Sequence, residues 1–151
     1  MIRKAKVQDI PSIKKLVEPY GKSGAMLPVS LAELYDRIRS FFLYENEGGT
    51  IVGVAALHIS WDDLAEIRSL AVSKEYKKRG IGRELVDSCL NEARELGVGR
   101  VFVLTYIPDF FKKLDFQEFD KAKLPHKIWS ECLKCAKFPE CDETALVKII
   151  R

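Results

Sequence analysis

The stretch that decides the fold is Leu70-Ala71-Val72-Ser73-Lys74-Glu75-Tyr76-Lys77-Lys78-Arg79-Gly80-Ile81-Gly82-Arg83-Glu84-Leu85. It joins the apolar end of an expected strand to a basic turn, and a pair of glycines then opens an amphipathic helix. Two glycines spaced by one residue let the backbone approach an anion closely, and the free N–H groups of a helix start point toward that anion. The stretch therefore predicts a phosphate-binding turn, the cradle, at residues 77–82.

The cradle differs from two common nucleotide-binding motifs. No lysine-serine or lysine-threonine pair follows Gly82, so it is not the phosphate loop of nucleotide hydrolases, and the six-residue glycine pattern of dinucleotide-binding folds is missing. A solvated basic face is the alternative interpretation of this lysine- and arginine-rich stretch. The adjoining glycines and helix start favour an anion site, and a different phosphate ligand is needed.

Composition sets the broad class. A chain of 151 residues with 47% hydrophobic and 31% charged residues is expected to form one globular domain over 1–151. The net charge of +3 is too small to argue for nucleic acid. No apolar run reaches membrane-spanning length, and the first residues lack the layout of a signal peptide, so we expect a cytoplasmic protein that does not bind a membrane.

Hydrophobic periodicity predicts alternating strands and helices. Expected strands cover 2–5, 41–45, 50–59, 64–72, 101–104, 116–119 and 145–150. Expected helices begin near Ile10, Leu31, Gly82 and Asp109, and Pro125 opens a last helical patch that ends near Cys135. Tight turns make 41–72 an antiparallel meander, and a helix joins 64–72 to 101–104, which favours a parallel pair. The prediction is a mixed α/β sheet with the cradle between two central strands.

The chain resembles the GCN5-related N-acetyltransferase (GNAT) superfamily through Leu70-Ala71-Val72, the cradle, and residues 110–116. The resemblance implies a mixed, mostly antiparallel sheet with a splayed parallel strand pair flanked by helices. It also implies acetyl-CoA, with its pyrophosphate on the cradle and its pantetheine arm along the strand that ends at Val72. The implied coenzyme-binding residues are Leu70, Ala71, Val72, Lys77, Lys78, Arg79, Gly80, Ile81, Gly82 and Arg83.

Further matches resemble the acetyltransferase domain of N-acetylglutamate synthases in a short, stand-alone form. They lie at residues 55–57, 64–72, 100–105 and 124–125. This resemblance implies acetyl transfer to L-glutamate in arginine biosynthesis, by direct attack of the amine on the thioester. Glutamine, another small amine and a protein N-terminus are the alternative acceptors, and a homodimer is left open. Phe111 stands where many GNAT members have a tyrosine that protonates the leaving thiolate.

Glu66 is the candidate general base, acting directly or through a water. It lies four residues before Leu70 and six before Val72, which places all three side chains on one face of a regular strand. A bulge near Leu70 would shift that phase. The alternative is a solvent-facing carboxylate paired with Arg68 or Arg39.

The other catalytic tasks are an oxyanion donor and a proton donor for the thiolate. A backbone N–H near Leu70 or Ala71 is the candidate oxyanion donor, and Thr105 or Tyr106 is the candidate proton donor. Ordinary packing at a strand end is the alternative for both hydroxyls.

L-Glutamate carries two carboxylates, so its site is expected to offer at least two cations. Arg39 and Arg68 are favoured and Lys127 is third, while Arg37 is also available on the second helix.

Two interpretations of other features stay open. His126, Cys132, Cys135 and Cys141 have the ligand types of a structural zinc site, but reduced thiols or one local disulfide are equally physical, and we assign no metal site. A non-catalytic module that binds nucleic acid or CoA is the alternative class. The glycine pair, and the lack of aromatic residues among the basic ones, argue against nucleic acid.

Overall fold

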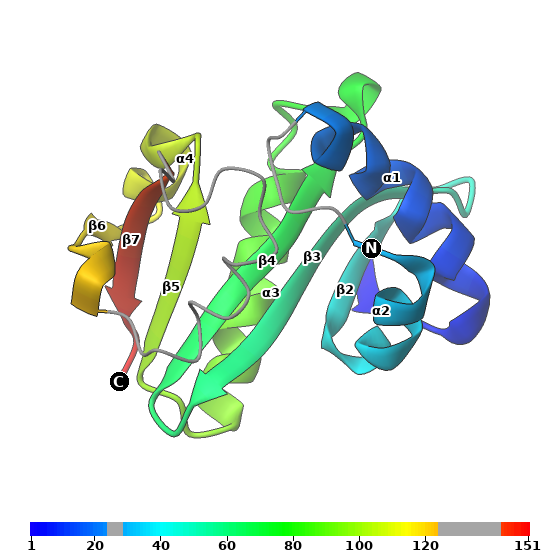
Figure 1. Cartoon of the computed structure of the whole chain (residues 1–151). Coiled ribbons are helices and arrows are strands. Elements are labelled where there is room, and N and C mark those ends of the chain that lie inside the picture. Colours follow the sequence, from blue (N-terminus) through cyan, green and yellow to red (C-terminus); the bar gives the residue numbers. More distant parts are fainter. Residues whose placement is uncertain (24–28, 124–142) are drawn as a thin grey trace.

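The computed structural model describes residues 1–23, 29–123 and 143–151. A seven-stranded sheet has the order β1-β2-β3-β4-β5-β7-β6 (Figure 1). The strands are β1 (Ile2–Lys4), β2 (Phe41–Glu45), β3 (Ile51–Trp61), β4 (Leu64–Val72), β5 (Arg100–Thr105), β6 (Gln117–Glu118) and β7 (Thr144–Ile149). The α-helices are α1 (Ile10–Ser23), α2 (Leu31–Asp36), α3 (Ile81–Glu95) and α4 (Pro108–Lys112). All neighbouring strands are antiparallel except β4 and β5, which confirms the predicted mixed sheet.

Helices cover both faces of the sheet. Helix α3 packs behind β2, β3 and β4, while α1 and α2 lie in front (Figure 1). The larger core joins α3 to the sheet through buried residues such as Leu85 and Cys89, and the smaller core joins α1 and α2 through Ile13 and Leu34. Burial raises the pKa of the Cys89 thiol to about 12, so this cysteine is an unreactive core residue.

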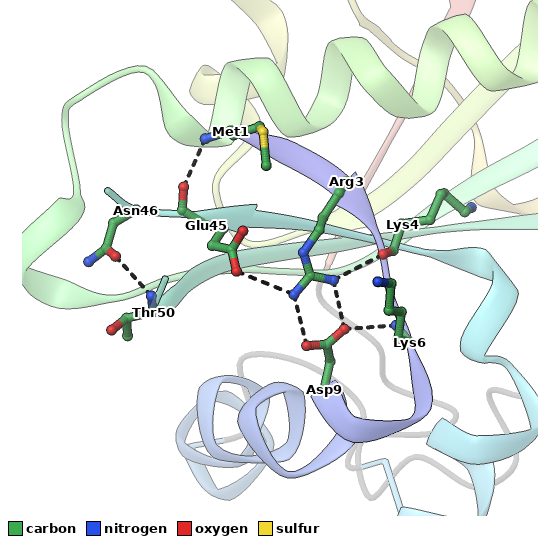
Figure 2. Close-up of polar contacts among 8 residues, drawn as sticks. All are labelled: Met1, Arg3, Lys4, Lys6, Asp9, Glu45, Asn46 and Thr50. Atoms are coloured by element: carbon green, nitrogen blue, oxygen red, sulfur yellow. Dashed lines mark hydrogen bonds and ion pairs between the residues drawn. The ribbon is translucent and has the colours of Figure 1, made fainter. Parts of the chain in front are cut away.

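Charged contacts anchor the N-terminal strand to α1 (Figure 2). Arg3 donates to both oxygens of Asp9, at 2.7 and 2.9 Å, and its Nη2 lies 3.5 Å from Glu45 Oε1. Asp9 also accepts from the Lys6 backbone N–H at 2.8 Å. The Arg3 guanidinium holds the pKa of the Asp9 carboxyl below its usual range. Asp9 thereby fixes the turn that leads into α1.

Most expected boundaries agree with the structure. Ser30 caps α2 by accepting from the Glu33 N–H at 3.2 Å, and Gly97, at φ +84°, follows α3. Strand β3 runs further than expected, because Trp61 pairs with Leu64 across a two-residue turn. The second helix is shorter than expected, since it ends at Asp36 and a 3₁₀ turn follows. The helical patch expected after Pro125 lies outside the described residues.

Candidate functional site

The two central parallel strands separate after a short contact. Strands β4 and β5 pair only at Ala65 with Val101 and at Glu66 with Phe102. Beyond that point their ribbons diverge (Figure 1), and in the described part of the chain no ladder joins residues 67–72 of β4 to β5. The resulting gap, which we name the splay, leaves one backbone edge of β4 open.

Alternation along β4 decides which backbone groups face the splay. The Ser73 N–H donates to the Val52 carbonyl at 2.8 Å, which makes Gly53 and Val72 a non-hydrogen-bonded pair. The N–H and C=O of Val72 therefore point away from β3 and into the splay. Consistent with this direction, the Tyr20 hydroxyl reaches the Val72 carbonyl from α1 at 3.2 Å. Ala71 bonds to β3, and Leu70 faces the splay again.

A β-bulge at Ser69 changes the faces of β4. Arg68 pairs with Ala56, but Ala71 pairs with Val54, so β4 holds one extra residue there, and Ser69 has a φ of +56°. The bulge places Leu70 and Val72 against the α3 core and leaves Glu66, Arg68 and Ala71 on the opposite face. The expectation for a regular strand, that Glu66 shares a face with Leu70 and Val72, is therefore wrong, and the alternative of a bulge near Leu70 that shifts the phase is confirmed.

The cradle follows β4 and opens α3. Gly80 adopts a left-handed conformation at φ +82°, and within the described residues no side chain caps the helix that starts at Ile81. The N–H groups of the first turn are thus available to an anion. Gly82 leaves room for a ring, since a Cβ there would lie 3.2 Å from Phe110 Cζ.

Aromatic side chains lie beside the basic residues of the cradle. Lys77 Nζ lies 5.6 Å from the centre of the Tyr20 ring, and the Arg79 guanidinium lies 4.7 Å from the Tyr76 ring. Tyr76 in turn accepts a hydrogen bond from Asn46 at 2.9 Å. The structure therefore brings the predicted coenzyme residues at 70–72 and 77–83 together at one end of the splay.

A pocket lies on the α1 and α2 face of the sheet, beside the bulge. The lining residues are Val29, Arg37, Ser40, Phe41, Ala56, His58, Arg68 and Ser69. Arg68 Nε donates to Glu66 Oε1 at 2.7 Å, and Glu66 is only 7% exposed. His58 lies directly opposite Glu66 in the β3–β4 pair, so both side chains are on the pocket's face. The pocket is therefore lined by two guanidinium groups and an imidazole, and the buried Glu66 carboxylate lies beside it.

Two of the predicted acceptor-binding residues can be located. Arg68 lines the pocket, whereas Arg39 is exposed and lies outside its lining. Arg37 lines the pocket instead, because the helical face changes where α2 passes into the 3₁₀ turn at Ile38–Ser40. Lys127 lies outside the described residues, as do His126, Cys132, Cys135 and Cys141.

The two candidate proton donors follow each other at the end of β5. Thr105 is 8% exposed, and its hydroxyl accepts from the Ile107 N–H at 2.9 Å, which supports the turn into α4. Tyr106 is half-buried. Phe111 is 2% exposed and packs edge-on against the rings of Phe110 and Phe116, so the place of the tyrosine found in many GNAT members is part of the core.

No group of three or more His, Cys, Asp or Glu side chains in the described ranges could hold a metal ion. No helix in the same ranges is long and apolar enough to cross a membrane.

Sequence reasoning missed three residues near the site: His58, Tyr20 and Ser69. Counting back from Glu66 across the Asp62-Asp63 turn gives Ile59 as its partner, and a register shift near Ser60 makes the partner His58 instead. The sequence carries the hairpin signal but not the shift. Tyr20 lies on the apolar face of α1 and packs against the smaller core, while its hydroxyl donates to the Val72 carbonyl of β4.

Comparisons with known proteins agree with this geometry. A family model described as "Acetyltransferase (GNAT) family" matches residues 11–116. An uncharacterized N-acetyltransferase from Chlorobaculum tepidum is 40% identical over 149 residues, which cover 99% of this chain and 96% of that protein. An amino-acid acetyltransferase from Mycobacterium tuberculosis is 37% identical over 133 residues, 87% of this chain and 76% of that protein.

A solved structure aligns over the whole chain. N-Acetylglutamate synthase from Neisseria gonorrhoeae, complexed with coenzyme A and N-acetyl-glutamate, has a TM-score of 0.91 and 29% identity. The alignment covers 100% of this chain and 35% of that protein.

Proposed function

This chain belongs to the GNAT acetyltransferase family, and we propose that it transfers the acetyl group of acetyl-CoA to the α-amine of L-glutamate. The coarser activity follows from the family: the chain is an acyltransferase that uses acetyl-CoA. An amino-acid acceptor is supported by the relatives named amino-acid acetyltransferases. Glutamate is supported by the structural likeness to an N-acetylglutamate synthase domain.

The coenzyme fits the residues that line the splay. The uncapped N–H groups at residues 81–83 and the basic side chains of the cradle suit the pyrophosphate. The backbone groups of Val72 and the Leu70 carbonyl suit the amides of the pantetheine arm, which would add an extended partner to the open edge of β4. The Ala71 N–H points toward β3, so Ala71 offers the coenzyme no N–H and only separates the two residues that face the splay.

The catalytic tasks are assigned to groups around the splay and the pocket. Glu66 removes the first proton from the acceptor ammonium, through a water where direct contact is not made. The Leu70 N–H, which faces the splay, stabilises the oxyanion. Thr105 or Tyr106, at the end of β5, protonates the departing CoA thiolate.

Acceptor binding is assigned to the cationic lining of the pocket. Arg68 and Arg37 are suited to the two carboxylates of glutamate. Arg68 has a double task, because its Nε also holds Glu66. Arg39 and Lys127 remain sequence predictions, to be compared with Arg37 by substitution.

One observation carries the proposal: the open β4 edge and the uncapped α3 start meet beside a pocket lined by two arginines. The test is a screen of amines with acetyl-CoA while free thiol is followed. Glutamate is expected to support turnover, and Glu66→Gln is expected to lower the rate. Robust turnover of glutamine, peptides or aminoglycosides with none of glutamate would overturn the acceptor. An unchanged rate in Glu66→Gln would remove Glu66 from the base role.

A further inference from the structure

His58 lies in the pocket, and the function proposed above gives it no role. It belongs to β3 and directly opposes Glu66 on β4. Directly opposed residues of an antiparallel pair have their Cβ atoms about 4.5–5.5 Å apart, on the same face. His58 lines the pocket, whereas Glu66 is 7% exposed and is not among the lining residues. The imidazole is therefore the acid–base group that the pocket exposes, and the carboxylate lies beside it.

The contacts of Glu66 explain why a second group is useful. One Glu66 oxygen already accepts from Arg68 Nε at 2.7 Å. A proton taken up by such a buried carboxylate must leave again before the next turnover. An imidazole changes its protonation between about pH 5 and 8, so at neutral pH it can both take up a proton and release it to water.

We propose that His58 is the outlet for the proton that Glu66 removes from the acceptor. This inference rests on the proposed acetyl transfer. The ammonium gives one proton to Glu66, and the freed lone pair forms the C–N bond to the acetyl carbon. As the C–S bond breaks, the sulfur keeps the electron pair and gains the second nitrogen proton through the donor at the end of β5. The first proton passes from Glu66 to the His58 imidazole and from the imidazolium to solvent.

The charged groups around His58 fit this role. In the described part of the chain, Glu66 and Arg68 face it from β4, and Arg37 faces the same pocket from the connection between α2 and β2. The negative charge of Glu66 stabilises a protonated imidazole, while the positive charges of the two guanidinium groups destabilise it. The imidazole therefore lies near charged groups of both signs.

The experiment compares kcat across pH 5.5–9 in wild type, His58→Gln and His58→Ala, with saturating acetyl-CoA and amino acid. Gln keeps the size of the side chain but cannot carry the proton. General acid–base groups contribute about 100- to 10,000-fold, and an outlet is expected to contribute less, so His58→Gln should lower kcat at pH 7 by roughly tenfold or more. The neutral-pH inflection of kcat should disappear, the KM for acetyl-CoA should stay, and added imidazole should restore activity to His58→Ala.

Ile59→Val is the matched control, since Ile59 is the next residue of β3, 42% exposed on the other face. It should retain the wild-type kcat and pH profile. A His58→Gln enzyme with wild-type kcat and inflection would overturn the inference. So would a folded His58→Ala enzyme that loses activity and is not rescued by imidazole, because the role would then be structural.

A second measurement does not depend on how the His58 variants fold. The chain has two histidines, so the His58 ring can be followed by NMR. Its titration midpoint should fall in Glu66→Gln, because a facing negative charge is removed. An unchanged midpoint would overturn the coupling. Wild-type protein that turns over no amine would overturn the proposed function as well, whereas an active wild type with an insensitive His58→Gln overturns this inference alone.

Discussion

Replacing Gly82 with alanine tests why the second glycine of the cradle is a glycine. A Cβ at this position would lie 3.2 Å from Phe110 Cζ, and unstrained carbon contacts are about 3.5–4.0 Å. The ring or the first turn of α3 must therefore shift by a few tenths of an ångström. Overpacking costs about 1–3 kcal/mol, and for one methyl group against a half-buried ring we take about 1 kcal/mol.

A gain in helix propensity opposes this cost. Alanine is more favourable than glycine in a helix interior by about 0.8–1.0 kcal/mol, and by less at the second helical position, where Gly82 lies. Gly82→Ala alone should therefore change the free energy of unfolding little or lower it slightly. In a Phe110→Leu background the contact is gone, and the same substitution should become stabilising. The expected coupling between the two positions is about 1 kcal/mol.

Urea denaturation of the four proteins in this cycle measures the coupling. A coupling of 1 kcal/mol corresponds to a shift of about 2–4 °C in Tm for a chain of this size. The KM for acetyl-CoA should rise in Gly82→Ala and recover in part in the double variant, because displacing the first turn of α3 moves the cradle N–H groups. Gly48→Ala is the control, since its Cβ would meet only Asn46 Oδ1 at an ordinary 3.5 Å. Strictly additive effects of the Gly82 and Phe110 substitutions would refute the packing argument.

Three further predictions concern other contacts. Asp9→Asn removes the charge held by Arg3 and should lower the free energy of unfolding by about 2 kcal/mol at pH 7. Because the pKa of Asp9 is lowered in the folded protein, this difference should persist above about pH 4 and vanish as the pH falls through the folded-state pKa. Tyr20→Phe should raise the KM for acetyl-CoA about fivefold with kcat retained, because losing the hydrogen bond that positions the Val72 carbonyl costs about 1 kcal/mol. An unchanged KM would argue against a role of Tyr20 in coenzyme binding. Arg37→Gln should raise the KM for glutamate more than Arg39→Gln does, and the reverse order would return Arg39 to the acceptor site.

The coenzyme half of the site was predictable because it depends on local signals. Glycines at fixed spacing, a helix start and a preceding apolar strand lie within one short stretch, and local backbone preference determines what they form. The extent of β4, Leu64–Val72, follows from the same kind of signal and agrees with the expected range. The parallel partner follows from the helix between β4 and β5, since such a connection joins parallel strands.

The acceptor half was less predictable because it depends on small irregularities, and the sequence indicates at most that a bulge near Leu70 could occur, not that it does. Ser69 has a φ of +56°, a conformation that no serine pattern indicates, and this bulge alone separates Glu66 from the face of Leu70 and Val72. The register shift beside Ser60 decides that His58 opposes Glu66. The Ser60 hydroxyl is buried and, among the described residues, lacks a hydrogen-bond partner, so no side-chain hydrogen bond of Ser60 marks this shift.

The change from α2 to a 3₁₀ turn has a similar consequence. It rotates the chain between Arg37 and Arg39, so the first arginine lines the pocket and the second is exposed. Helical periodicity in the sequence does not indicate this switch, so it does not predict which of the two arginines faces the pocket. The sequence shows that arginines are available near the pocket, but only the tertiary structure shows that Arg37, and not Arg39, lines it.

Amide hydrogen exchange on the full chain, with and without CoA, tests directly whether the coenzyme binds between β4 and β5. Bound CoA should slow exchange at Val72 and Leu70, whose N–H groups face the splay, and at residues 81–83, whose N–H groups lack a side-chain cap. The Ala71 amide, which faces β3, should change little. Protection that spreads evenly over the basic surface, or an unchanged rate at Val72 and Gly82 at saturating CoA, would contradict the placement of the coenzyme between β4 and β5.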